Sequence, residues 1–185
     1  MIEKRIMDWH IIFAGFRNTK ISDPNVFLNR IRKKALDCQV QVFDAERIAG
    51  LDHLYFSVLN ALKAVESGNK ISDSLAMEIL LYASGQHQIE KAIQMLGVKP
   101  CSSQIVIVIL SKTKEKLMET MLRISKIIEG EQSDEVINLT DEKIQVLKST
   151  FKISDAELEA TLRKSKKEAL TSILIERSAL LVTQT

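Results

Sequence analysis

The sequence predicts a mixed α+β fold, in which several helices pack on a small β-sheet and the C-terminal half is rich in helix. Three observations lead to this prediction. The chain has 185 residues, of which 45% are hydrophobic and 27% charged, as expected for a globular protein with a single domain over residues 1–185. Three short stretches are rich in β-branched residues. The segments between and after them have helical periodicity.

The three β-branched stretches are predicted to be strands. His10–Phe16 (HIIFAGF) combines isoleucines with aromatic residues, and Gln39–Phe43 (QVQVF) alternates polar and apolar residues like a half-buried strand. Gln104–Leu110 is continuously apolar after its first residue, which predicts a central strand covered on both faces.

Helices are predicted from capping residues and apolar spacing. Asp23 suits the N-cap and Pro24 the first position of a helix that runs to about Leu36. The helix at 51–65 is apolar on nearly every side, so it is buried in its own domain or shared with a partner, and it stops near Gly68. Further helices are predicted to start near Ser72 or Ser74, after the Ser84-Gly85 break, near Lys112 and near Thr140. Another is predicted to start at Ser154, which matches a capping box with Glu157. A final helix covers 170–182.

Charge, cysteines and hydropathy limit the class of protein. The net charge of +2 gives no bulk attraction for nucleic acid, so any RNA binding must be local. Cys38 and Cys101 have no CxxC partner, and reduced cysteines in a cytoplasmic protein are expected. The N-terminus lacks the pattern of a signal peptide, and no apolar run is long enough to cross a membrane.

No catalytic motif stands out. The sequence has neither of the common glycine-rich phosphate loops and no GxSxG serine, and its three histidines are not at metal-ligand spacing with the cysteines. His53, at the start of a buried helix, is expected to be held by local hydrogen bonds. We therefore expect no enzyme activity, no metal, no cofactor and no small-molecule substrate. A mechanism built from scattered residues is the enzyme alternative.

The stretch Leu80–Pro100 (LLYASGQHQIEKAIQMLGVKP) holds the most specific feature. A buried helix breaks at Ser84-Gly85, and an amphipathic helix follows that ends at Gly97. The free N–H groups of a helix N-terminus, approached closely over a glycine, make a candidate anion site, to which His87, Gln88 and Lys91 could add donors. The alternative is a plain helix–helix corner capped by Ser84.

The same stretch carries a resemblance to a known family. The combination E-I-L-L-Y-x-S-G-x-x-Q-I over Glu78–Ile89, with Gly50-Leu51-Asp52-His53-Leu54 before it and Gly97-Val98-Lys99 after it, resembles the kinase-binding small subunit of the KEOPS complex. That family includes archaeal subunits and the eukaryotic PRPK-binding proteins (TPRKB). The resemblance covers most of the chain.

The resemblance implies a non-catalytic subunit of the complex that makes threonylcarbamoyladenosine in tRNA. Such a subunit binds and stimulates the atypical kinase/ATPase subunit and recruits tRNA through its single-stranded CCA 3′ end. A regulator of a kinase without RNA binding is the alternative. Where the family pattern often has arginine before Gln-Ile, this chain has His87. The residues expected to contact tRNA are Tyr82, Ser84, Gly85, Gln86, His87, Gln88 and Lys91, with Tyr82 serving either for stacking or as a core residue.

The last helix predicts the kinase interface. On a helical wheel of about 100° per residue, Leu170, Ile173, Leu174, Leu180 and Leu181 cover one broad side, interrupted by Arg177. Ile175, Ala179 and Val182 form a second apolar stripe, and a helix needs only one stripe to dock on its own core. The second stripe is therefore expected to bind the kinase, together with residues of 51–65. In the alternative, the helix lies between two layers of its own domain, or its end is a strand.

Overall fold

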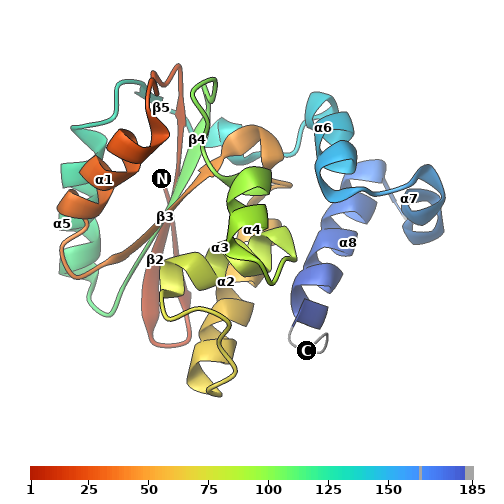
Figure 1. The fold of residues 1–185 in the computed structure, drawn as a ribbon, viewed down its shortest axis with the longest axis horizontal. Coiled ribbons are helices and arrows are strands. Elements are labelled where there is room, and N and C mark those ends of the chain that lie inside the picture. Colours follow the sequence, from red (N-terminus) through yellow and green to blue (C-terminus); the bar gives the residue numbers. More distant parts are fainter. Residues whose placement is uncertain (163, 182–185) are drawn as a thin grey trace. The chain divides into compact units, whose positions relative to one another are not determined.

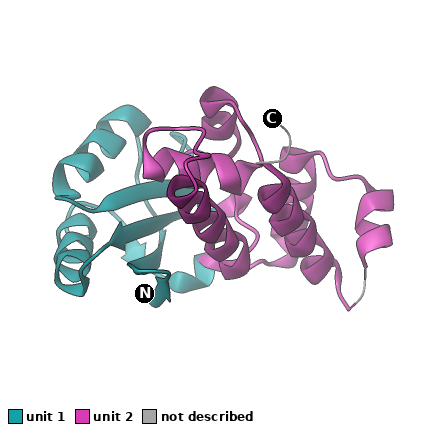
Figure 2. Ribbon diagram, turned by 90° about the horizontal axis from the view of Figure 1, so that it is seen from below, with its two compact units in different colours: residues 1–45, 98–136 teal, residues 46–97, 137–185 magenta. Residues whose placement is uncertain are grey.

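The computed structural model describes residues 1–162 and 164–181 and confirms the mixed α+β fold (Figure 1). The chain forms two compact units, which Figure 2 distinguishes by colour. The sheet unit comprises Met1–Ala45 and Val98–Val136. The helical unit comprises Glu46–Gly97 and the described residues from Ile137 onward. Because each unit combines two separate stretches of the chain, neither is a contiguous domain, and the single domain over 1–185 stays a prediction.

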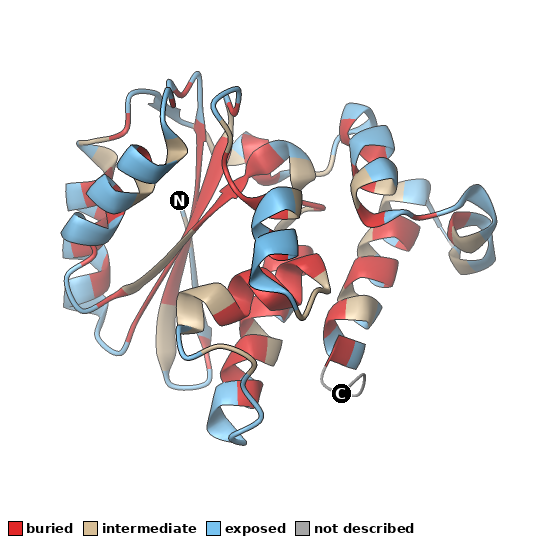
Figure 3. Cartoon of the chain, viewed as in Figure 1, coloured by how far each residue is buried: buried red, intermediate tan, exposed pale blue. Residues whose placement is uncertain are grey.

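The sheet unit is built on five antiparallel strands. Strands β1 (Ile2–Ile6), β2 (Trp9–Arg17), β4 (Ile105–Ser111) and β3 (Gln39–Asp44) lie in that order across the sheet, and β5 (Glu131–Gln132) pairs with the end of β2. The central position of β4 confirms the prediction from its apolar sequence: all seven of its residues are buried, as Figure 3 shows. Strands β1 and β5 were not expected from the sequence.

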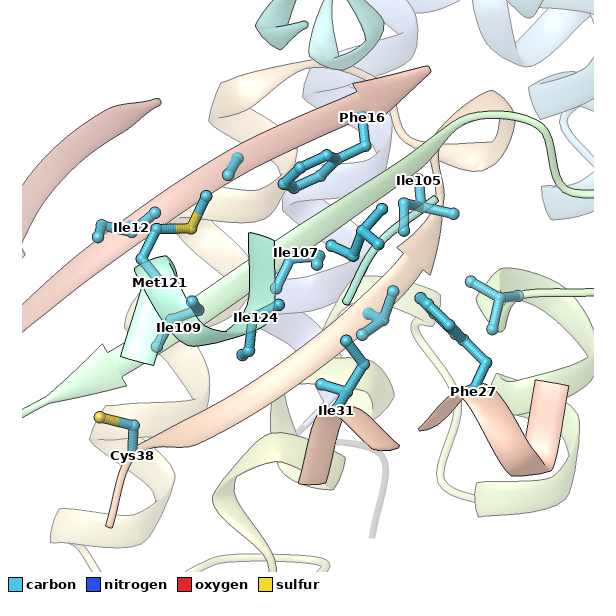
Figure 4. Packing of buried hydrophobic residues seen from close by; sticks show 14 of the residues in the cluster. Ile12, Phe16, Phe27, Ile31, Cys38, Ile105, Ile107, Ile109, Met121 and Ile124 are labelled. Atoms are coloured by element: carbon cyan, nitrogen blue, oxygen red, sulfur yellow. The ribbon is translucent and has the colours of Figure 1, made fainter. Parts of the chain in front are cut away.

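Helices α1 (Pro24–Lys34) and α5 (Lys114–Ser125) contribute to one core with the sheet. Figure 4 shows Phe27 and Ile31 of α1, and Met121 and Ile124 of α5, with the side chains of alternate residues of β2 and β4. Ile31 and Ile124 are almost fully buried, and burial of such a side chain contributes roughly 1.5–3 kcal/mol. As predicted, Asp23 caps α1: its carboxylate accepts N–H bonds from Asn25 at 2.8 Å and Val26 at 3.2 Å.

The helical unit contains the other six α-helices. They are α2 (Leu51–Glu66), α3 (Leu75–Ser84), α4 (Ile89–Leu96), α6 (Asp141–Phe151), α7 (Asp155–Thr161) and α8 (Lys166–Leu180). Helix α2 packs against both α3 and α8, and α7 packs against α8. Single 3₁₀ turns, η1 (Ala45–Arg47) and η2 (Asp134–Ile137), lie at two of the points where the chain passes between the units.

Helix starts and stops in the helical unit mostly follow the predictions. Ser74 and Ser154 are N-caps whose hydroxyls accept N–H bonds three residues ahead, and Gly68 ends α2 with φ +76°. Thr140 is at the N-cap position of α6, but its side chain makes no capping bond. The two helices predicted to start at Ser154 and to cover 170–182 are present as α7 and α8, but α8 begins earlier, at Lys166.

Candidate functional site

The predicted break at Ser84-Gly85 is confirmed, because helix α3 ends at these residues, but the following helix does not start on them. Gly85 adopts the left-handed conformation with φ 61° and ψ 34°. The Gln86 N–H donates to the Leu81 carbonyl at 3.1 Å and the Gly85 N–H to the Tyr82 carbonyl at 3.3 Å, which is the Schellman arrangement of a helix C-terminus. The glycine therefore terminates α3 and does not bring an anion to a helix N-terminus.

The following helix, α4, begins four residues later. Its N-cap is Gln88, whose side chain accepts no capping bond from the first turn. At the other end, the Arg47 guanidinium donates to the carbonyls of Gln94 at 3.3 Å and Met95 at 2.9 Å. The buried side of the helix consists of Ala92 and Leu96.

The predicted RNA-binding residues divide by exposure. Tyr82 and Ser84 are 1% and 2% exposed, so their side chains are not accessible in this structure, and the core alternative describes Tyr82. The Ser84 hydroxyl donates to the Leu81 carbonyl at 3.0 Å and does not cap α4. Gly85, Gln86 and His87 are half-buried, whereas Gln88 and Lys91 are exposed. The accessible part of the predicted site is therefore the loop 85–88 and the first turn of α4.

Two exposed apolar residues of α4 were not singled out from the sequence. Ile89 and Ile93 are 41% and 45% exposed and lie one turn apart. Lys91 points away from them, about 160° from Ile93 around the helix axis. The apolar spacing of α4 predicts one continuous stripe, and only the tertiary contacts decide that Ala92 and Leu96 are covered while Ile89 and Ile93 are not. We call the exposed residues Gln88, Ile89, Lys91 and Ile93 the α4 surface, although Lys91 lies on the side of the helix opposite the two isoleucines.

Hydrogen bonds and burial fix the tautomer and the protonation state of His53, which bonds to the backbone near the end of α3. The backbone N–H of Ala49 donates to His53 Nδ1 at 3.2 Å, so the imidazole carries its proton on Nε2 and donates it to the Ala83 carbonyl at 2.8 Å. Burial lowers the pKa of His53 to about 4, which keeps it neutral. Its predicted role as a histidine satisfied by local hydrogen bonds is confirmed.

The tyrosine at the same corner is also kept neutral. Burial and the neighbouring Glu78 carboxylate raise the pKa of Tyr82 to about 12. Neither the Tyr82 hydroxyl nor His87 Nε2 has a hydrogen-bond partner among the residues that the structure describes.

Helix α8 presents the predicted kinase-binding stripe in part. Ile175 is half-buried and Ala179 exposed, whereas Val182 lies outside the described residues. Leu170, Ile173 and Leu174 are buried as the wheel predicts, but Leu180, which the wheel groups with them, is 45% exposed. Arg177, which interrupts that side, donates to the Phe151 carbonyl at 2.6 Å and to both oxygens of Glu157, at 2.7 and 3.0 Å.

Ile175 lies on the wall of an open groove of about 510 Å³. The groove is bordered by the start of α2 at Gly50–Asp52, by Leu139, and by Lys167, Glu168, Thr171 and Ser172 of α8. The Thr171 hydroxyl donates to the Ala49 carbonyl at 3.1 Å, which ties the two helices together at this end. Further along, the Asn60 amide donates to the Ser178 hydroxyl at 3.1 Å. An apolar residue in a groove with a polar rim is typical of a protein-binding surface.

A metal centre or a membrane span finds no support in the described part of the chain. No group of three or more histidine, cysteine, aspartate or glutamate residues there could hold a metal ion. None of the described helices combines the length and the apolar character needed to cross a membrane.

Comparison with known proteins decides the family. The family model of the kinase binding protein CGI-121 matches residues 17–181. This chain belongs to the CGI-121 family. The predicted relationship to a kinase-binding family is thereby confirmed. The regulatory protein Cgi121 of Methanocaldococcus jannaschii is 29% identical over 143 residues, a match that covers 77% of this chain and 85% of that relative. The residues that the family model matches include α3, α4 and α8, and hence both candidate surfaces.

Proposed function

We propose that this CGI-121 family member is a non-catalytic regulatory subunit of KEOPS, the complex that makes threonylcarbamoyladenosine in tRNA. It binds and stimulates the atypical kinase/ATPase subunit and recruits tRNA through the single-stranded CCA end. The observation that carries the proposal is the match to a kinase-binding family over residues 17–181. The name of the archaeal relative, a regulatory protein, supports the non-catalytic role.

The kinase-binding surface is proposed to lie on α8 and α2. Ile175 and Ala179 form its centre, with the groove of about 510 Å³ beside Ile175. Phe56 of α2, 36% exposed, extends it, because it lies one turn before Asn60, whose side chain contacts α8. Aromatic and aliphatic residues that fill pockets of a partner usually dominate protein interfaces. Val182 completes the proposed stripe in the sequence.

The α4 surface and the loop before it are proposed to hold the CCA end. Single-stranded RNA is recognised through bases that are turned outward, where they pack on flat or apolar side chains and form hydrogen bonds along their edges. Ile89 and Ile93 supply apolar area, Gln86 and Gln88 supply amides, and Lys91 supplies a charge. Lys91 makes no ion pair with any residue in the described ranges, so no carboxylate competes with a phosphate for it.

Co-purification with the kinase/ATPase subunit and binding to tRNA test the two halves of the proposal. Lys91→Glu should weaken binding to intact tRNA and change binding to tRNA without its CCA end very little. Gln94→Glu, on the same helix and exposed, is the control for added negative charge. An equal loss for both RNAs would place the contact on another basic surface, such as the stretch 163–167, which reads RKSKK. Kinase binding without any tRNA binding would favour the purely protein-binding regulator.

A further inference from the structure

Helix α1 in the sheet unit ends in a group of exposed basic residues. Within α1 there are four basic residues and no aspartate or glutamate. None of the four forms an ion pair within the described ranges, and Arg32 only donates a long bond of 3.4 Å to the Asn29 side chain. We call Arg30, Arg32, Lys33 and Lys34 the α1 cations.

The cations of α5, the other helix of the same core, form ion pairs. On α5, Lys114 pairs with Glu3 at 2.9 Å, Lys116 with Asp37 at 2.5 Å, and Arg123 with Glu119 at 2.6 Å. The bond from Lys116 lowers the pKa of Asp37, as expected for a formed pair. The sheet unit therefore neutralises these three cations of α5 and leaves those of α1 exposed and without partners in the described ranges.

The placement of the α1 cations narrows the kind of anion that they suit. At about 100° per residue they spread over roughly 200° of the helix surface, and the apolar side with Phe27 and Ile31 is buried in the core. An interfacial membrane helix would need that apolar side exposed. A broad row of cations whose apolar side is already covered instead suits the repeated phosphates of a nucleic acid.

We propose that the α1 cations bind the phosphate backbone of RNA outside the CCA end. The proposal rests on the proposed function, because tRNA is the polyanion that this function brings to the chain. The contact is electrostatic and independent of sequence, so it would add affinity for the body of the tRNA and not for particular bases. It is consistent with the small net charge of the whole chain, because α1 itself carries four cations and no acidic residue.

The test compares two double variants that remove the same charge from the same unit. Arg30→Gln/Lys33→Gln removes cations without partners, and Lys114→Gln/Lys116→Gln removes paired ones. Affinities for intact tRNA and for tRNA lacking CCA are measured against salt concentration, together with the thermal midpoint of each variant. For each phosphate that the α1 variant no longer neutralises, we expect binding roughly fivefold weaker at about 0.15 M salt and a salt slope shallower by about 0.7–0.9.

The outcomes separate this inference from the proposed function. It is supported if the α1 variant binds both RNAs more weakly with a shallower slope while the α5 variant changes little. If CCA removal abolishes binding but the α1 variant is unchanged, or only melts earlier, the proposed function stands and the α1 cations merely stabilise the helix C-terminus. If the α1 variant loses binding to anionic phosphatidylserine vesicles and keeps binding to tRNA, the inference is overturned. Absence of wild-type binding to either RNA overturns both proposals.

Discussion

His53 joins three helices of the helical unit at the level of single atoms. Its ring nitrogens bond to the backbone at Ala49 and Ala83, and its ring meets that of Phe151 edge to face at 5.9 Å between centroids. The imidazole is fully buried and neutral, with a pKa lowered by burial to about 4. Its protonation would place a charge without a counterion in the core, which is unfavourable.

We expect His53 to make the protein less stable in mild acid. Below pH 6.5, the usual pKa of histidine, His53 binds a proton in the unfolded chain. In the folded chain it binds that proton only below about pH 4. The free energy of unfolding should therefore fall as the pH falls through this window, by about 3 kcal/mol from this residue. His53→Gln, whose amide can accept from Ala49 and donate to Ala83, should lack that component. Urea unfolding of both proteins at several pH values measures it, and parallel pH curves would contradict the assignment.

Other single residues show what a sequence can and cannot specify. The caps at Asp23 and Ser154 were predictable because the side chain bonds to a backbone group two or three residues away. Glu157 does not complete the predicted capping box, because its carboxylate is bound by Arg177, twenty residues later. At Ser84-Gly85 the same residue types fit a helix start or a helix end, and only the bonds of the neighbouring backbone distinguish them.

At the scale of elements, the ends of α3 and α6 provide a matched pair. Both use the Schellman arrangement, with Gly85 at φ 61° after α3 and Lys152 at φ 53° after α6. A left-handed backbone costs a residue with a side chain about 1 kcal/mol more than it costs glycine. Gly85→Ala should therefore lower the free energy of unfolding by about 1 kcal/mol, and Lys152→Gly should raise it by somewhat less because glycine adds entropy to the unfolded chain.

Thermal unfolding of the two variants checks the pair. A Cβ at Gly85 would lie 3.7 Å from the Arg177 side chain, an ordinary contact, so its cost comes from the backbone and not from a clash. A change of about 1 kcal/mol shifts the midpoint by about 2–4 °C in a protein of this size. If the thermal midpoints of both variants shift in the same direction, the left-handed backbone is not the common cause of the two effects.

Helix α8 allows a direct test of the proposed kinase surface. Ile175→Asp should weaken association with the kinase subunit and leave the melting temperature of the isolated chain unchanged, since Ile175 is only half-buried. Leu122→Asp is the control, because Leu122 is 57% exposed on α5 and lies outside the proposed surface. Unfolding of the isolated Ile175→Asp chain would instead identify Ile175 as a core residue and move the interface elsewhere.

Most elements were predictable from local patterns, and the exceptions are features that depend on residues distant in the sequence. The long strands and the capped helices have signals within their own residues. Strand β1 is five residues long with three charged residues in its centre, which suits an edge strand but hides the alternation of a buried one. Strand β5 has two residues and forms only because β2 offers a free edge. Exposure of Leu180 and Ile93 depends on distant neighbours in the same way.

For the whole molecule, the sequence predicted the architecture and the family, and the structure redefines the candidate surfaces. The proposed RNA-binding residues reduce to those that are accessible around α4, and the proposed kinase-binding stripe has a groove beside Ile175. Net charge and composition could not indicate that unpaired cations gather on α1 while those of α5 are neutralised. That difference depends on which acidic residues the fold brings within reach.

The ATPase activity of the kinase subunit, measured with and without this chain, is the decisive test of the proposed regulatory role. Intact tRNA and tRNA lacking its CCA end are each added to the reconstituted pair. We expect that the chain stimulates ATP hydrolysis, that intact tRNA stimulates it further, and that removing CCA or introducing Lys91→Glu reduces the effect of the tRNA. Ile175→Asp should reduce stimulation at limiting concentrations of the chain. If the wild-type chain leaves the ATPase rate unchanged, with or without tRNA, it is not a stimulatory subunit of this kinase.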